Sequence, residues 1–179
     1  ILPIGPTSYG DSPYQSFSTY AGNPYFISLE ELIEQGLLTE KECDKVDFGD
    51  KIDKVDYEKL YNGRFKLLKK AYKRSNIRER EEFKKFKDEN QYWLNDYAMF
   101  MAIKERFKGQ SFDNWAEDIK LRWGYSMEYY QNELKEEIEF YEFVQYEFYR
   151  QWYKLKKYAN DNGVKIIGDI PIYVAYDSA

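Results

Sequence analysis

The sequence has no histidine and a single cysteine, Cys43, among its 179 residues. Without histidine the chain cannot form a Ser-His-Asp triad or a histidine-based metal site, and a catalytic thiol would lack its usual general base. One cysteine allows no disulfide within the chain, which suits a reducing compartment. We therefore expect a cytoplasmic protein, and nothing in the sequence indicates a metal or an organic cofactor.

Long apolar runs and a surplus of basic residues are also missing. No apolar run approaches the roughly 18 residues that a membrane-spanning helix needs, and no signal peptide is visible. The net charge is −5 at pH 7, whereas proteins that bind nucleic acid usually carry a basic surplus. Acidic residues flank the lysine-rich run at 66–73, which we interpret as a solvated helix face. We expect neither a membrane nor a nucleic acid as partner.

Aromatic residues are abundant, at 20% of the chain within a hydrophobic share of 43%. This composition is sufficient for a sizeable core. The chain starts with Ile1 inside an apolar run and stops at Ala179 just after another such run. We therefore expect a segment of a longer protein.

The segment GPTSYGDSPYQSFSTYAGNPY, residues 5–25, follows the apolar residues 1–4, which we predict to be the end of a buried strand. Repeated proline and glycine exclude a helix here. Its many tyrosines exclude a flexible linker, because linkers rarely carry aromatic side chains. The sequence thus predicts a rigid, aromatic loop directly after a strand.

Helical patterns fill most of the remaining chain. Capping residues predict helix starts at Ser28 with Glu31, at Thr39 with Glu42, at Asp56 and at Ser111, the last around Trp115. Glycines predict helix ends at Gly36, Gly109 and Gly163, and residues 76–108 look helical nearly throughout.

The strongest periodicity runs from residue 127 to residue 159. Its stripe comprises Leu134, Ile138, Tyr141, Gln145, Phe148, Trp152, Leu155 and Ala159. A helix packed in a globular body explains this stripe better than a coiled coil, because the stripe contains a glutamine and bulky rings. We expect the acidic residues at 133–142 to be solvated on the polar flank.

Residues 164–174 form a β-branched run after the long helix and its turn, which is the second half of a βαβ unit. We therefore expect an α/β fold in which strands at 1–4 and 164–174 lie parallel in one sheet. The long helical excursion between them is an insertion. The predicted division is a strand and substrate loop at 1–27, a helical insertion at 28–126, and a long helix with its strand at 127–179.

The opening loop and Asp169 are predicted to share one edge of this sheet. In parallel barrels, ligands bind on the loops that follow the strands. Aromatic rings with a few fixed carboxylates suit a sugar, whose C–H face stacks on a ring while its hydroxyls form hydrogen bonds. The plainer interpretation is that most of the tyrosines only pack the loop against the protein.

Three motifs resemble the 4-α-glucanotransferases, also called amylomaltases or disproportionating enzymes, of glycoside hydrolase family 77. They are LPIGPTSYGDSPYQSFS at 2–18 with AGNP at 21–24, WLNDYAMF at 93–100, and the run 151–175 with its GDIPIYVA. The first resembles the loop after the second barrel strand of that family, and the last resembles its third strand. The resemblance covers the whole chain and implies part of a (β/α)8 TIM barrel with a large helix-rich insertion.

The resemblance also implies a reaction and a site. The family transfers α-1,4-glucan segments to a sugar 4-hydroxyl through a glycosyl-enzyme intermediate, a retaining mechanism that uses two nearby carboxylates. It implies that Tyr14 contacts the sugar at the cleavage site and that Asp169 supports the same subsite. Ser12 is expected near the sugar, Asp11 as a brace of the turn, and Tyr9 on an accessory glucan surface. The catalytic residues are expected outside this chain, on later strands.

Two other functions remain open at this point. A non-catalytic α-glucan-binding module would use the same loop residues without transferring sugar. A helical interaction protein would present the stripe of residues 127–159 to a partner.

Overall fold

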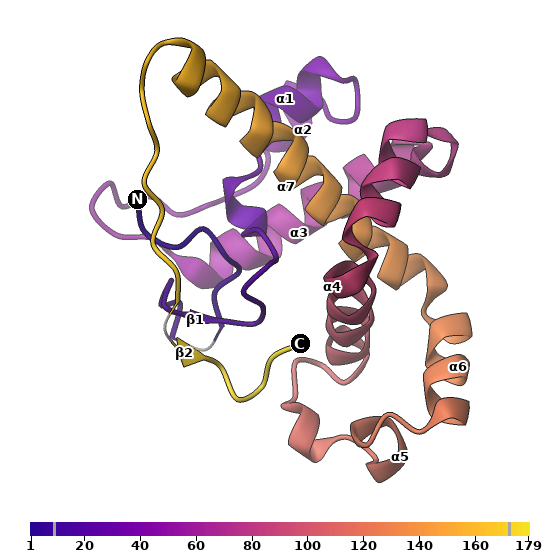
Figure 1. Ribbon diagram of the computed structural model, residues 1–179. Helices are drawn as coiled ribbons and strands as arrows, with labels where there is room; N and C mark the ends of the chain where they lie inside the picture. Colours follow the sequence, from indigo (N-terminus) through magenta and orange to yellow (C-terminus); the bar gives the residue numbers. More distant parts are fainter. Residues whose placement is uncertain (9, 172) are drawn as a thin grey trace.

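The computed structural model describes residues 1–8, 10–171 and 173–179, and most of them are helical (Figure 1). Helices α4 and α7 pack against each other in the middle of the molecule, and α3 also packs on α7. In chain order the elements are β1 (Gln15–Ser16), η1 (Pro24–Phe26), α1 (Leu29–Glu34), α2 (Glu40–Cys43), α3 (Tyr57–Arg74), η2 (Ile77–Glu79), α4 (Glu81–Arg106), η3 (Phe112–Asn114), α5 (Glu117–Lys120), α6 (Gly124–Glu133), α7 (Lys135–Asp161) and β2 (Tyr173–Val174).

Local signals confirm most of the predicted helix ends. The Ser28 hydroxyl accepts a hydrogen bond from the Glu31 N–H at 3.2 Å, and an Asp56 carboxylate oxygen accepts one from the Lys59 N–H at 3.1 Å. Thr39 begins α2 with a capping box. The glycines that follow helices in left-handed conformation are Gly36, Gly109 and Gly163. Around Trp115 the structure has two short helices, η3 and α5, on either side of this residue.

The helix predicted from residue 127 onward is two helices, α6 and α7, with a break at Leu134. Leu134 has φ −104° and ψ 25°, outside the helical range, and its side chain is buried. No proline or glycine causes the break. At the break the Leu134 side chain packs into the hydrophobic core.

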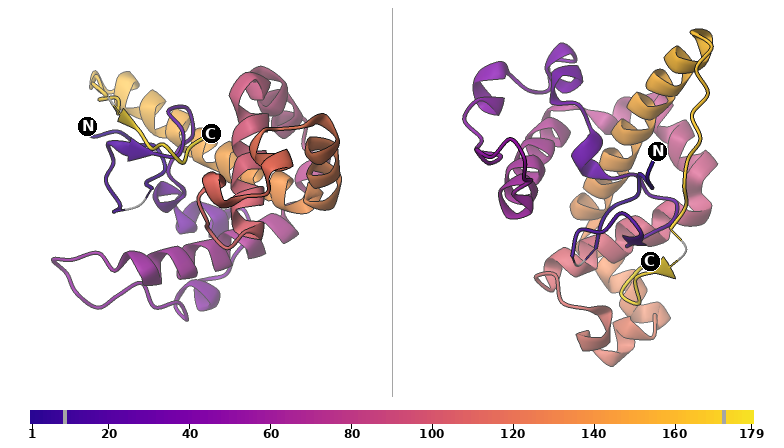
Figure 2. Two further views of the ribbon diagram at one scale, coloured as in Figure 1. Left: turned by 90° about the horizontal axis from the view of Figure 1, so that it is seen from below. Right: turned by 90° about the vertical axis from the view of Figure 1, so that its left-hand side faces the viewer.

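The centre of α7 is buried on all sides, which corrects the expectation of a solvated acid at Glu142, whereas Glu133 and Glu136 are exposed as expected and Glu137 and Glu139 are half-buried. Residues Phe140 to Phe148 are all buried, and Glu142 is among them. The rings of Phe140 and Phe143 contact Tyr72 of α3, while Tyr146 contacts α4 from the other side of the helix. Figure 2 shows α7 running between neighbouring helices, and its middle turns are buried.

The two predicted strands are largely wrong. Residues 1–4 form no strand, and among the described residues of the run that begins at 164 strand conformation is confined to β2. A strand needs a ladder of hydrogen bonds to a neighbour. Beside this run lies the N-terminus, whose amino group donates to the Ile167 carbonyl at 2.7 Å, and one such bond is not a ladder.

A parallel pair does exist, but its first strand lies inside the opening loop and not at residues 1–4, while its second lies within the predicted run at 164–174. β1 pairs with β2, with Gln15 opposite Tyr173 and Ser16 opposite Val174. Over the described residues this pair is only two residues long on each side. The (β/α)8 barrel and the three-part division of the chain therefore stay predictions.

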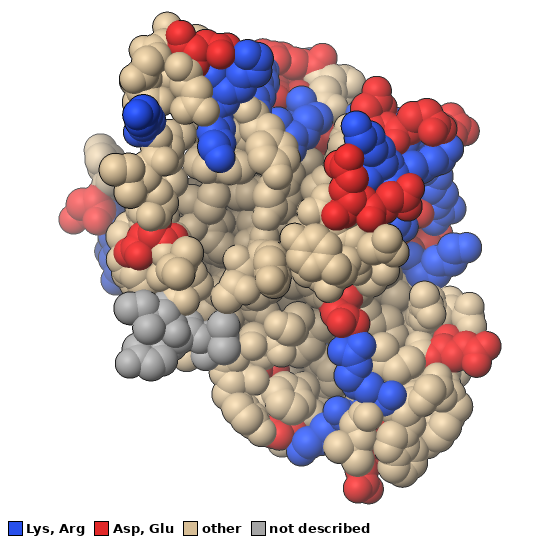
Figure 3. Space-filling view, viewed as in Figure 1, with Lys and Arg blue, Asp and Glu red and all other residues tan. Residues whose placement is uncertain are grey.

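In the part of the chain that the structure describes, no helix is both long enough and apolar enough to cross a membrane. Charged side chains gather toward the top and right of the face in Figure 3, and fewer lie across its middle.

Candidate substrate site

The opening loop folds back on itself before it reaches β1. The Ser8 N–H donates to the Gln15 carbonyl at 3.1 Å. Between them Gly10 and Asp11 have φ values of 81° and 54°, a left-handed conformation that glycine adopts freely and aspartate tolerates. The loop therefore reverses direction within a few residues and leaves Tyr14 next to the strand pair.

Asp11 and Ser12 both support this turn. The Thr7 hydroxyl lies 3.5 Å from an Asp11 carboxylate oxygen, and the Ser12 hydroxyl accepts from the Tyr14 N–H at 3.3 Å. Short polar side chains commonly stabilise turns in this way. The place of Ser12 near a sugar stays a prediction, and Tyr9 falls outside the described residues.

Tyr14 and Asp169 meet at the surface although 155 positions separate them in the sequence. The Tyr14 hydroxyl donates to one Asp169 carboxylate oxygen at 2.9 Å, and the Ile170 N–H donates to the other at 2.9 Å. The hydrogen bond to Asp169 raises the pKa of Tyr14 above its ordinary value. The structure thus brings together the two residues that the sequence analysis expected at one edge.

Both side chains are exposed to solvent and accessible to a ligand. The tyrosine offers an apolar ring face, and the carboxylate, fixed by two donors, retains lone pairs for a sugar hydroxyl. These groups can hold and orient a sugar ring, whereas cleavage with retention needs two carboxylates about 5–5.5 Å apart. Among the described residues, no group of three or more His, Cys, Asp or Glu could hold a metal ion.

A cavity of about 410 Å³ lies between the opening loop and helices α3 and α4. Its lining includes Asp11 and a set of aromatic side chains: Phe17, Tyr25, Tyr57, Tyr61, Phe65 and Tyr97. Burial, together with the charge of Asp11, raises the pKa of Tyr25 to about 12. An aromatic cavity of this size can accept the apolar faces of sugar rings.

The sequence analysis did not single out the aromatic residues that α3 contributes to this cavity. Tyr57, Tyr61 and Phe65 are spaced four residues apart, which places them on one helix face. This spacing is the signal that would have identified them. Their proximity to the opening loop is a tertiary contact that the sequence alone does not reveal.

The whole chain, residues 1–179, matches the family described as 4-alpha-glucanotransferase. It is 50% identical over 179 residues to the 4-alpha-glucanotransferase of Clostridium butyricum, and 42% identical over 183 residues to that of Thermus thermophilus. These alignments cover 100% of this chain but only 37% and 36% of the two relatives. The chain therefore spans little more than a third of the relatives that it matches.

A solved structure agrees with these matches. The amylomaltase from Streptococcus agalactiae, determined in complex with acarbose, superposes with a TM-score of 0.90 and 41% sequence identity. The superposition covers 99% of this chain and 36% of that one. With the family match extending over its full length, the chain belongs to the 4-alpha-glucanotransferase family, glycoside hydrolase family 77.

Proposed function

We propose that this chain is the glucan-contacting portion of a 4-α-glucanotransferase, an enzyme that moves α-1,4-glucan segments to the 4-hydroxyl of another sugar. The activity belongs to the complete protein, since the chain spans 37% of its Clostridium butyricum relative. The proposal includes a (β/α)8 barrel, to which this chain contributes two strands and the helical insertion between them, and a cytoplasmic location.

The observation that carries this proposal is the hydrogen bond between Tyr14 and Asp169. The resemblance assigns both residues to the same sugar subsite, and the fold brings them within 2.9 Å of each other from opposite ends of the sequence. The β1–β2 pair, with Gln15 opposite Tyr173, holds the two segments that carry these residues side by side.

In the proposed mechanism, the sugar at the cleavage site stacks against the Tyr14 ring, and Asp169 accepts a hydrogen bond from one of the sugar's hydroxyls. Two carboxylates from the rest of the enzyme act as nucleophile and as acid/base in a double displacement that retains configuration. Transfer exceeds hydrolysis when a sugar rather than water occupies the acceptor position. Aromatic surfaces such as the cavity beside the loop favour that outcome, because they hold a glucan segment without needing charge.

The alternative of a non-catalytic glucan-binding module has no specific observation in its favour. The relatives that match the whole chain bear the name of the transferase, and none of those reported above is named as a binding module.

Tyr14 tests this function in the complete protein. Tyr14→Ala should lower kcat/KM for disproportionation of maltotriose on the order of tenfold to hundredfold, because a stacking surface and a hydrogen bond are lost together. The melting temperature should change little, since the side chain is exposed. Tyr158→Ala is the matched control, because Tyr158 is also exposed and lies at the far end of α7. Transfer that is unchanged in Tyr14→Ala would contradict the assignment.

A further inference from the structure

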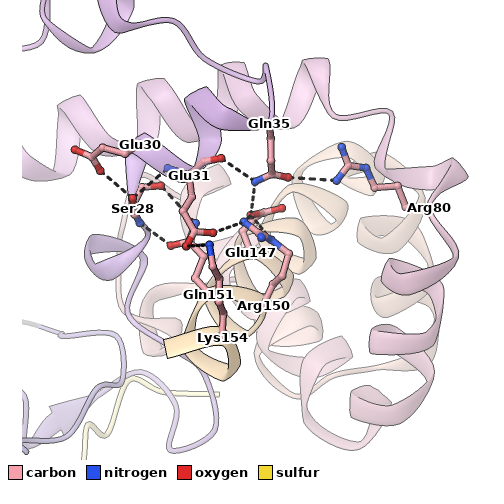
Figure 4. Close-up of polar contacts among 9 residues, drawn as sticks. All are labelled: Ser28, Glu30, Glu31, Gln35, Arg80, Glu147, Arg150, Gln151 and Lys154. Carbon is pink, nitrogen blue, oxygen red and sulfur yellow. Dashed lines mark hydrogen bonds and ion pairs between the residues drawn. The ribbon is translucent and has the colours of Figure 1, made fainter. Parts of the chain in front are cut away.

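Two glutamines on α7, Gln145 and Gln151, each bind both polar groups of one backbone residue near the opening loop. The Gly22 N–H donates to Gln145 Oε1 at 2.7 Å, and Gln145 Nε2 donates to the Gly22 carbonyl at 3.0 Å. Gln151 repeats the pattern on Ser28, with distances of 2.7 and 3.4 Å. Figure 4 shows the second of these contacts, beside the start of α1. A carboxamide can do this because it carries both a donor and an acceptor.

The two contacts differ in what they hold. Gly22 belongs to the opening loop itself, whereas Ser28 lies beyond η1 and caps α1. Gln145 is completely buried, while Gln151 is only partly buried. Burial of a carboxamide is costly unless each polar atom has a partner, so the Gly22 backbone and Gln145 depend on each other.

Close packing reinforces the contact at Gly22. A Cβ atom at this position would lie 1.9 Å from a ring atom of Phe148, which is one turn along α7 from Gln145. The absence of a side chain therefore lets the loop backbone approach the helix closely enough to reach the buried carboxamide. This glycine is needed for its small size, and the approach fixes the loop against one position of α7.

Hydrogen bonds lead from this contact toward Tyr14. The Asn23 N–H donates to the Ile4 carbonyl at 2.8 Å, which ties the two ends of the loop together. The Ser18 hydroxyl accepts from the Ala21 N–H at 3.4 Å, and the Ser16 hydroxyl accepts from the Ser18 N–H at 3.2 Å. Ser16 lies in β1, two residues after Tyr14. These hydrogen bonds connect the Gly22 contact to β1, the strand that begins directly after Tyr14.

We propose that Gln145 is a positioning residue for the sugar subsite, and that Gln151 is not. Gln145 fixes the opening loop on α7, and the segment that carries Asp169 leaves the C-terminal end of the same helix. The helix thereby sets the spacing between Tyr14 and Asp169. The inference rests on the proposed function for its effect on transfer, whereas its effect on the Tyr14–Asp169 contact is independent of that function.

The test compares Gln145→Met with Gln151→Met in the complete protein, since methionine keeps the side-chain volume and removes the carboxamide. A 3-fluorotyrosine placed at position 14 reports the contact with Asp169 by ¹⁹F NMR. Asp169→Ala supplies the reference shift for a tyrosine without its partner. We expect Gln145→Met to move the resonance toward that reference and Gln151→Met to leave it in place, at a temperature where both variants are folded.

Disproportionation of maltotriose supplies the second readout. We expect kcat/KM to fall on the order of tenfold to hundredfold in Gln145→Met, as a small misplacement at a sugar site can produce, and to stay near wild type in Gln151→Met. An unmoved resonance in Gln145→Met overturns the inference, as does an equal shift in both variants. A shifted resonance with unchanged transfer supports the positioning and refutes the proposed role of Tyr14. Should Gln145→Met not fold, Gln145→Leu, which also removes the carboxamide without burying a charge, takes its place, and the same outcomes apply.

Discussion

The centre of α7 buries polar side chains, whereas the segment at 164–171 exposes apolar ones. In α7 the charged and polar side chains of Glu142, Gln145 and Glu147 are buried. In the following segment, Ile167 and Ile170 are 82% and 76% exposed. Hydrophobicity therefore does not decide which of these two regions is inside. What decides it is whether the side chains of a region have neighbours to pack against or to form hydrogen bonds with.

The buried polar side chains of α7 each have a specific partner, although one oxygen of Glu147, Oε1, accepts no hydrogen bond. Glu142 pairs with Lys87 at 2.7 Å, and Gln145 holds the Gly22 backbone. Glu147 accepts from Gln35 and from Arg150, as Figure 4 shows. Pairing of this kind offsets the cost of removing polar groups from water. The apolar segment at 164–171 is instead the part of the chain that the proposed barrel would cover with further strands.

The largest expected effect is on the free energy of unfolding of the 179-residue chain, when one side chain is truncated in each of the two regions. Phe143→Ala should lower the free energy of unfolding by about 3–5 kcal/mol, because it empties a fully buried position between α7 and α3. Ile167→Ala should change it by less than about 0.5 kcal/mol, because the side chain is already in water. Urea denaturation of the two variants measures both values.

The same pair of variants in the complete protein tests the proposed barrel. Ile167→Ala should then lower the free energy of unfolding by about 2–4 kcal/mol, since the side chain would pack against neighbouring strands. The Phe143→Ala value should stay as it is, which makes this variant the internal control. An equally small effect of Ile167→Ala in both proteins would contradict the prediction that barrel strands cover Ile167 in the complete protein.

A smaller effect is expected at the ion pair of Glu142 with Lys87. Lys87→Met should lower the free energy of unfolding by about 1–3 kcal/mol, because it leaves the buried Glu142 carboxylate without its partner. The control is Lys85→Met, whose pair with Glu89 is exposed and should contribute less than about 0.5 kcal/mol. The double variant Lys87→Met/Glu142→Leu should recover much of the loss, because no buried charge remains. A double variant as unstable as Lys87→Met would contradict this account.

This pair also has a pH dependence with a defined sign. Burial raises the pKa of Glu142, so the folded protein binds this proton more tightly than the unfolded chain does. The contribution to stability is fully present below the unfolded pKa of about 4.3 and is lost as the pH rises through the folded pKa. Lys87 lowers the pKa of Glu142. In Lys87→Met the loss of stability with rising pH should therefore be larger than in the wild type.

The sequence predicts local features of this fold well and non-local features poorly. Ser28 and Asp56 cap helices where expected, because capping depends on residues three or four positions away. Burial of Glu142 depends on Lys87 in another helix, which no periodicity in α7 reveals. The strand at 1–4 was wrong for the same reason, since pairing needs a neighbour.

In the candidate site, too, local motifs were predicted from the sequence and tertiary contacts were not. Tyr14 and Asp169 were identified through motifs, and the structure adds that they share a hydrogen bond. The aromatic cavity was missed, although Tyr57 and Tyr61 lie one helical turn apart, because the loop that faces them is distant in sequence. The position of Gln145 in the stripe was recognised, but its contact with Gly22 follows only from the fold.

The smallest expected effect concerns Glu42, a polar side chain that has partners without deep burial. Hydrogen bonds from the Arg74 guanidinium lower the pKa of Glu42 to about 2, and the Thr39 hydroxyl and Lys70 add to this. The folded protein therefore holds this proton less tightly than the unfolded chain. The stabilisation is present above the unfolded pKa of about 4.3 and is lost as the pH falls toward 2.

Melting temperatures between pH 6 and pH 2 test this last difference. The wild type should lose stability faster than Glu42→Gln over the window between the two pKa values, and the two curves should converge at its acidic end. Curves that stay parallel would show that Arg74 does not hold the Glu42 carboxylate in solution. Because its contribution is lost on acidification, whereas that of Glu142 is lost on alkalinisation, the two carboxylates separate the effect of a partner from the effect of burial.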